Sequence, residues 1–316
     1  MPGEVVLKFK KAAIITGYSC NNNCLFCYDG LKRGVRDLST GEIKKNLDGA
    51  RSRGASCVDF LGGEVTIRRD FLELVAYAKR IGFSHVMATS NSRMFSYPEF
   101  AEKAVAAGLS TVVFSIHGDS AQLHDALTRS PGSFEQSLAG LENIRRLGAQ
   151  VCCNFTIVRQ NYERLPQTAK MFLEKNVSSA EFIFVHPYGY ALSQFDEVVP
   201  RLSQVEPFLH EALDAGVAAG AKHWVARYLP VCFMRGYEKH LSELSEPVME
   251  HVGPEFSDFD VSANRKNNGR VLGPACENCR DSLLCEGPWL EYARRRGFGE
   301  LRPLPGEKKQ LKDYLR

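Results

Sequence analysis

The feature that most constrains the fold is a regular alternation between short apolar runs and longer amphipathic stretches. The apolar runs occupy residues 12–16, 57–61, 85–88, 111–116, 151–158 and 181–185. They are almost continuously apolar, which is typical of strands buried on both faces. The stretches between them have the apolar spacing of amphipathic helices. The alternation therefore predicts repeated strand–helix units around a parallel sheet.

Local signals mark where the helices begin and end. Ser39 and Glu42 have the spacing of a capping box, and so do Ser133 and Gln136. Pro98 is suited to a first helical position, and glycines at 54, 82, 108 and 148 stand where helices should stop. Six units are too few for a closed eight-stranded barrel. We therefore expect an α/β fold, a partial (β/α)6 TIM-like barrel with a small C-terminal cysteine-rich extension.

The periodic pattern weakens in the second half of the chain. We expect residues 1–190 to form the barrel core and residues 191–316 to form the C-terminal extension. Within the extension, residues 202–213 have the pattern of an amphipathic helix. Residues 243–273 are polar and weakly periodic, so they are expected to form a flexible loop or lid.

Three cysteines, Cys20, Cys24 and Cys27, lie within eight residues directly after the first apolar run. A fully ligated 4Fe-4S cluster takes four thiolates, so three would leave one iron open to an outside ligand. Closely spaced cysteines also form disulfides or zinc sites. A disulfide is disfavoured because the chain opens without the apolar run of a secretory signal. Zinc would need a fourth ligand, and only Cys57 is available between residues 1 and 80.

The triad resembles the signature of the radical S-adenosylmethionine (SAM) superfamily. A second sequence, Gly-Gly-Glu-Val-Thr at residues 62–66, resembles that family's Gly-Gly-Glu-Pro-Thr, with valine in place of proline. The resemblance implies a 4Fe-4S cluster on the triad, chelation of the open iron by the methionine end of SAM, and one-electron cleavage to a 5′-deoxyadenosyl radical. It also implies that Gly62 and Gly63 bind the methionine amino group and that Glu64 is available to an ammonium.

Further SAM contacts follow from the same resemblance. Phe26 lies inside the triad, and Asn91 closes the third apolar run, where the family often contacts its cofactor. Residues 114–134 resemble the fourth strand and following loop of the branch that contains peptide maturases and dehydrogenases. There the resemblance implies that Ser115 binds the ribose or carboxylate of SAM and that Arg129 pairs with the carboxylate.

The same loop carries three other polar residues. His117 stands where the family usually has an aspartate. For His117 and His124, structural capping and a role in the site both stay open. Asp125 is expected to order the loop rather than to transfer protons.

A second cysteine group lies near the end of the chain. Of the ten cysteines, Cys57, Cys152 and Cys153 lie in apolar strands and are expected to be small core residues. Setting aside these and the triad leaves Cys232, Cys276, Cys279 and Cys285. The spacing of the last three resembles the SPASM extension of radical enzymes, but Trp289 stands where that pattern continues with cysteine. This implies one auxiliary 4Fe-4S cluster, as in the shorter twitch-type extension, and structural zinc stays open.

Composition limits the partners. The 40 basic and 37 acidic side chains give a formal charge of +3, which provides no electrostatic footprint for nucleic acid or a membrane surface. No apolar stretch is long enough to span a bilayer. Ten cysteines without a secretory signal indicate a reducing compartment, so we expect a cytoplasmic protein. The expected partners are a small-molecule or peptide substrate and an electron donor such as flavodoxin or ferredoxin.

These features together predict a radical SAM enzyme with SAM and two 4Fe-4S clusters. We expect a net oxidation or bond-forming modification of a small molecule or cofactor precursor, because the barrel begins about a dozen residues from Met1 and leaves little room for a peptide-recognition domain before it. Maturation of a ribosomally made peptide is the alternative within this class. A non-catalytic iron–sulfur electron carrier and a zinc-stabilised scaffold are the alternatives from other classes.

Overall fold

The computed structural model describes residues 10–221 and 223–314. They contain one nine-stranded sheet in the order β7-β6-β5-β4-β3-β2-β1-β8-β9. Neighbouring strands are parallel except β8 and β9, which are antiparallel. The strands are β1 (Lys10–Ile15), β2 (Cys57–Leu61), β3 (His85–Ser90), β4 (Thr111–Ser115), β5 (Gln150–Ile157), β6 (Ser179–Phe184), β7 (His223–Arg227), β8 (Val248–Val252) and β9 (Ser257–Asp258).

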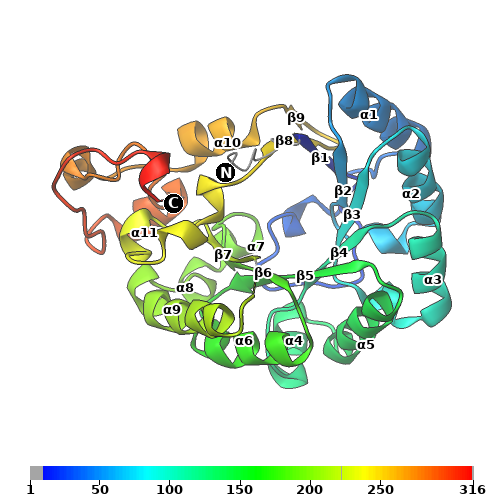
Figure 1. Ribbon diagram of the computed structural model, residues 1–316, viewed down its shortest axis with the longest axis horizontal. Coiled ribbons are helices and arrows are strands. Elements are labelled where there is room, and N and C mark those ends of the chain that lie inside the picture. Colours follow the sequence, from blue (N-terminus) through cyan, green and yellow to red (C-terminus); the bar gives the residue numbers. More distant parts are fainter. Residues whose placement is uncertain (1–9, 222, 315–316) are drawn as a thin grey trace, which may run out of the picture.

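The sheet curves into an open barrel whose outer face is covered by helices (Figure 1). The longer helices are α1 (Thr40–Ser52), α2 (Phe71–Arg80), α3 (Pro98–Ala106), α4 (Ala121–Thr128), α5 (Ser133–Arg146), α6 (Leu165–Glu174) and α9 (Leu202–Ala218). Shorter ones are α7 (Tyr190–Ser193), α8 (Phe195–Val198), α10 (Val261–Asn264) and α11 (Leu290–Arg296). The main core lies between sheet and helices, where residues such as Phe60, Phe71 and Phe172 are fully buried. The predicted partial TIM-like α/β barrel is confirmed.

Most of the predicted helix boundaries are confirmed. Ser39 and Glu42 form a capping box at the start of α1, and Pro98 begins α3. All four glycines predicted to end helices have positive φ. The capping box predicted at Ser133 and Gln136 is wrong, because α5 begins at Ser133 itself, one residue earlier than that box requires. Gly132 is the cap, and the Ser133 hydroxyl donates to Asp125 instead.

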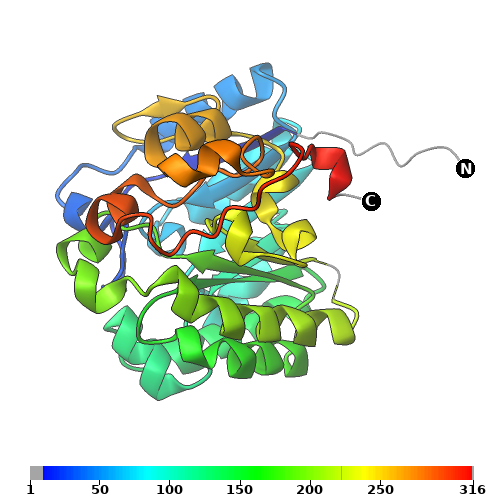
Figure 2. The same cartoon turned by 90° about the vertical axis from the view of Figure 1, so that its left-hand side faces the viewer.

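The C-terminal part contributes more regular structure than its sequence suggested. The six predicted strands correspond to β1–β6, but β7 extends the sheet beyond β6, and β8 pairs with β1. The expectation of a flexible loop at residues 243–273 is therefore wrong for much of that segment, which forms β8, β9 and α10. The sheet thus continues across the boundary expected at residue 190. In Figure 2 this segment, in yellow and orange, lies next to the first strands of the sheet.

A buried carboxylate holds β8 in place. Glu250, in the middle of β8, has no exposed side-chain surface and accepts two hydrogen bonds from Arg53, at 3.0 and 2.8 Å. Its second partner is Lys10 on β1, at 3.0 Å. These long-range ion pairs compensate for burying a charge in a strand that lacks an apolar run. No helix in the described part of the chain is both long and apolar enough to cross a membrane.

Candidate active site

A cavity of about 700 Å³ lies at the carboxyl ends of the strands. Strand-end residues Ile15, Leu61, Ser90 and Ser115 line it, as do residues from the C-terminal part of the chain. This edge is where parallel α/β folds bind their ligands. The cavity is therefore enclosed by the barrel on one side and by the C-terminal segment on the other.

The cysteine triad lies on the loop that follows β1. Cys20, Cys24 and Cys27 all line the cavity. The backbone N–H groups of Asn23 and Leu25 donate to the last turn of α4, at 2.9 and 2.8 Å, which anchors the loop between the cysteines. Burial raises the pKa of all three thiols, that of Cys20 to about 11, so iron binding must release their protons. Three soft sulfur donors beside open space fit a 4Fe-4S cluster with one iron left for an outside ligand.

Two glycines bring the end of β2 against the start of this loop. A Cβ atom on Gly62 would lie 2.4 Å from the Gly17 carbonyl oxygen, and one on Gly63 would lie 2.1 Å from that of Ser19. Gly62 also has a φ of +142°, which side chains rarely allow. Both glycines line the cavity. The close approach brings the end of β2 to the edge of the cavity, and the contact of these glycines to the methionine end of SAM stays a prediction.

Glu64 has a different role from the predicted one. Its side chain is 3% exposed and does not line the cavity. The carboxylate accepts hydrogen bonds from the backbone N–H of Thr66 (3.0 Å), the Ser90 hydroxyl (2.7 Å) and the Asn91 backbone N–H (2.6 Å), with a further bond from the Thr66 hydroxyl. Burial raises its pKa although these bonds act against the change. Through these bonds Glu64 ties the end of β2 to the end of β3, and the structure does not bring its side chain to the cavity with the other predicted SAM contacts.

The other predicted SAM contacts divide into two groups. Residues that line the cavity with the triad are Phe26, Gly62, Gly63, Asn91 and Ser115. Asn91 is held by a 2.7 Å hydrogen bond from its side-chain amide to Asn21, within the triad loop. Arg129 does not line the cavity: it caps α4 with a φ of +51°, and its guanidinium donates to Gln194 at 3.3 Å. The structure therefore does not bring Arg129 together with the others.

Asp125 and the two histidines of the same loop are all ordered by hydrogen bonds. Asp125 accepts from the backbone N–H groups of Gly132 (2.6 Å) and Phe134 (2.8 Å), which confirms its predicted role in ordering the loop. His124 Nδ1 accepts from the His117 backbone N–H at 3.1 Å, so His124 does act as a cap. His117 itself lines the cavity.

The wall of the cavity contributed by the later part of the chain is aromatic, and the sequence did not predict it. His186 stacks flat on Trp289, with ring centroids 3.6 Å apart. Tyr228 contacts Trp289 at 4.6 Å, and Tyr28 of the triad loop contacts His186 at 4.9 Å. All four residues line the cavity. The sequence signals for this wall are the aromatic segment His-Pro-Tyr-Gly-Tyr at residues 186–190 and Trp289, which lies near the last cysteines.

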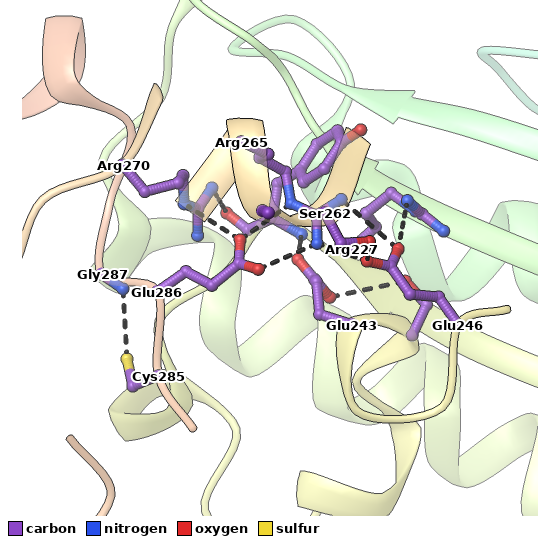
Figure 3. Close-up of polar contacts among 12 residues, drawn as sticks. Arg227, Glu243, Glu246, Ser262, Arg265, Arg270, Cys285, Glu286 and Gly287 are labelled. Carbon is purple, nitrogen blue, oxygen red and sulfur yellow. Dashed lines mark hydrogen bonds and ion pairs between the residues drawn. The ribbon is translucent and has the colours of Figure 1, made fainter. Parts of the chain in front are cut away.

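A buried ionic network supports that wall (Figure 3). The Arg265 guanidinium pairs with Glu246 at 2.6 Å and with Glu286 at 2.8 Å. Arg227 on β7 pairs with the same Glu246 at 3.2 Å and with Glu181 on β6 at 2.6 Å. Burial acts to raise the pKa of Glu246, but the hydrogen bonds from Arg265 and Ser262 and the charges of Arg227 and Arg265 together outweigh it, and the pKa is lowered. The network connects the barrel to the loop that carries Cys285.

The second cysteine group lines a separate, smaller cavity. Cys232, Cys276, Cys279 and Cys285 all contribute to it, so the chain folds back to bring Cys232 to the other three. Backbone N–H groups of Val231 (3.4 Å) and Gly287 (3.3 Å) donate to the Cys285 sulfur, and that of Leu304 donates to Cys279 (3.4 Å). In residues 10–221 and 223–314, no three His, Cys, Asp or Glu side chains converge closely enough to hold a single metal ion. The predicted core positions of Cys57 and Cys153 are confirmed, and Cys152 is half-buried.

Comparison with known proteins agrees with the site. Residues 14–172 match the family model described as radical SAM superfamily. The Fe-coproporphyrin III synthase of Methanosarcina barkeri is 27% identical over 312 residues, which cover 94% of this chain and 73% of that protein. The AdoMet-dependent heme synthase of the same organism is 32% identical over 60% of this chain, and the mycofactocin maturase MftC of Mycolicibacterium smegmatis is 30% identical over 59%. The matches cover 54% and 47% of those two proteins, so the chain spans about half of their length.

The fold also agrees with solved structures. Streptococcus suis SuiB bound to S-adenosylmethionine superposes with a TM-score of 0.66 over 92% of this chain and 75% of that chain, at 14% sequence identity. The family implies a 4Fe-4S cluster and SAM, and its members named above are enzymes. From the triad at the strand ends, the glycine edge beside it and the match over half of the sequence, we conclude that this chain is an enzyme of the radical SAM superfamily.

Proposed function

We propose that this enzyme abstracts a hydrogen atom from a small molecule or cofactor precursor and completes a net oxidation or bond-forming modification. When bound, a reduced 4Fe-4S cluster and SAM supply the 5′-deoxyadenosyl radical. Cys20, Cys24 and Cys27 would hold that cluster. Phe26, Gly62, Gly63, Asn91 and Ser115 would hold SAM, because they line the same cavity.

The size and lining of the cavity carry the proposal for a small substrate. A volume of about 700 Å³ is within the range of a pocket for one drug-sized ligand, yet this cavity must accept SAM and substrate together. The aromatic wall of His186, Tyr228 and Trp289 offers flat apolar surface for a compact substrate. The relative aligned over 94% of the chain is named a synthase of Fe-coproporphyrin III, a small molecule.

Peptide maturation is the second candidate. One relative is named a mycofactocin maturase and another a PqqA peptide cyclase, each matched over about half of its length. A peptide would have to place one side chain in the cavity and leave the rest outside. The two candidates therefore differ in how much of the substrate the cavity encloses.

We further propose that Cys232, Cys276, Cys279 and Cys285 hold one auxiliary 4Fe-4S cluster of the SPASM/twitch type. The four thiols line one cavity, and four thiolates are the number that fully ligates such a cluster. Backbone N–H donors to the sulfurs would stabilise thiolate charge. With four protein ligands such a cluster has no open iron, so its task would be to accept the electron left on the substrate radical.

The proposed partners are those expected from the sequence. An electron donor such as flavodoxin or ferredoxin would reduce the triad cluster, and a reducing cytoplasm would preserve the free thiols. Neither nucleic acid nor a membrane is proposed as a partner.

The experiment searches for the substrate by measuring the product of SAM cleavage. Anaerobically reconstituted, reduced enzyme is incubated with SAM and either iron-coproporphyrin III and related small molecules or a library of synthetic peptides, and 5′-deoxyadenosine is measured. The proposal expects a small molecule to raise 5′-deoxyadenosine formation, and deuterium from the labelled substrate to appear in it. Stimulation and deuterium transfer by peptides alone would make peptide maturation the better assignment.

A further inference from the structure

His117 is a buried residue that lines the cavity. One nitrogen of its ring has no partner in the contacts described so far. It lies two residues beyond β4, is 5% exposed and lines the cavity. Its ring meets the ring of Phe26 edge to face, with centroids 4.8 Å apart. Because Phe26 lies between Cys24 and Cys27, His117 belongs to the part of the cavity wall that faces the triad loop.

Backbone contacts fix the tautomer of this ring. The Thr156 backbone N–H donates to His117 Nδ1 at 3.1 Å, so Nδ1 is the acceptor nitrogen. Burial lowers the pKa of His117 well below 6.5, which keeps the ring neutral near pH 7. A neutral imidazole with an accepting Nδ1 carries its proton on Nε2. The side chain is thus a hydrogen-bond donor of fixed orientation.

Nothing in the described part of the chain accepts a hydrogen bond from His117 Nε2. Because protein atoms do not fully enclose Nε2, this donor can be reached from the cavity that His117 lines. The ring cannot turn to find another partner without losing its bond to Thr156. The partner is therefore expected in the molecule that fills the cavity.

We propose that His117 binds SAM by donating its Nε2–H to an acceptor of the cofactor. SAM offers such acceptors in its adenine nitrogens, its ribose hydroxyls and its carboxylate. The position favours SAM over the substrate, because Phe26 contacts the His117 ring and Ser115 lines the same cavity, and both are proposed to hold SAM. The inference rests on the proposed binding of SAM at the triad.

A histidine at position 117 gives this part of the cavity wall a hydrogen-bond donor that an aspartate would not provide. An aspartate at this position could accept from Thr156, but an ionised carboxylate has no proton to donate. The histidine satisfies the same backbone N–H and adds a donor. This chain therefore has a SAM contact that an aspartate at the same position could not make.

A matched pair of variants tests the contact. His124 stacks parallel to His117, with ring centroids 5.9 Å apart, and likewise accepts from one backbone N–H, but it does not line the cavity. His117→Phe and His124→Phe each replace a buried imidazole by phenyl and each leave one backbone N–H unpaired. Only the first removes a donor from the cavity. SAM affinity is measured by isothermal titration calorimetry on anaerobically reconstituted protein, with iron content and melting temperature determined in parallel.

We expect His117→Phe to weaken SAM binding about tenfold at unchanged iron content, and His124→Phe to change it less than about twofold. If His117→Phe does not retain its cluster, His117→Gln, which can donate, is compared with His117→Met, which cannot. The glutamine variant should bind SAM more tightly. Equal affinities within either pair would contradict the proposed contact. Failure of the wild-type protein to bind SAM would instead overturn the proposed function and this contact with it.

Discussion

At the scale of single residues, a sequence motif predicted where a side chain stands better than what it contacts. Glu64 lies at the end of β2 as expected, yet its carboxylate is enclosed by donors from Thr66, Ser90 and Asn91. The sequence could not predict this, because Ser90 and Asn91 belong to the next strand and only folding brings them to Glu64. Asp125 was predicted correctly because its partners, from Gly132 to Phe134, are local in sequence.

The first prediction concerns Glu64. Glu64→Ala leaves the donors of Ser90 and Asn91 without a partner, at about 1–3 kcal/mol for each buried group. We expect a clear loss of unfolding free energy in urea denaturation, accompanied by weaker SAM binding as the edge loosens. Glu64→Gln should be intermediate, and Glu73→Gln on the exposed face of α2 should be neutral. If SAM affinity falls while the unfolding free energy is unchanged, the Glu64 side chain contacts SAM directly.

At the scale of elements, periodicity predicted the strands that are buried by apolar contacts and missed those held by ion pairs. The runs that became β1 to β6 are apolar in sequence, and their burial follows from composition. β8 carries Glu250 and His251 and reads as polar, because what buries it is a pairing with Arg53, 197 residues away in the chain. Such a contact has no local signal. The same holds for the aromatic wall, which joins Tyr228 to Trp289 across the fold.

The second prediction tests the ion pairs of β8 through pH. Burial acts to raise the pKa of Glu250, but hydrogen bonds from Arg53 and Lys10 outweigh it and hold the pKa below its ordinary value of 4.5. The stabilisation is therefore complete above about pH 4.5 and is lost as the pH falls through the lower folded-state pKa. Glu250→Gln should cost about 1–3 kcal/mol of unfolding free energy at pH 7. The difference from wild type should shrink on acidification below pH 4.5; a difference that does not change with pH would show that the charge of Glu250 is unimportant.

At the scale of the whole molecule, the C-terminal part both encloses the cavity and carries the second cysteine group. The ionic network of Arg227, Glu246, Arg265 and Glu286 connects these two tasks, because Glu286 follows Cys285 directly. The sequence predicted both cysteine groups from their spacing. It did not predict that Arg265, which lines the first cavity, would pair with Glu286 beside the second group, because these residues meet only in the folded chain.

The third prediction separates the two cysteine groups. Replacing Cys276 and Cys279 by Ala should reduce iron from about eight to about four per chain, because one of two proposed clusters is lost. Reductive cleavage of SAM should remain detectable, since the triad is untouched. Cys152→Ala is the matched control, because Cys152 lines neither cavity. Stoichiometric zinc in the wild-type protein, with no loss of iron in the double variant, would make the second site a zinc site.

The central claim is tested most directly by reductive cleavage of SAM. Anaerobically reconstituted protein is reduced with dithionite in the presence of SAM, and 5′-deoxyadenosine is quantified by mass spectrometry beside the variant in which Cys20, Cys24 and Cys27 are all Ala. The account predicts that the wild-type protein forms 5′-deoxyadenosine and that the variant, with about half of the iron, forms none. Equal formation by both proteins, or none by a wild-type protein that retains its full iron, would contradict it.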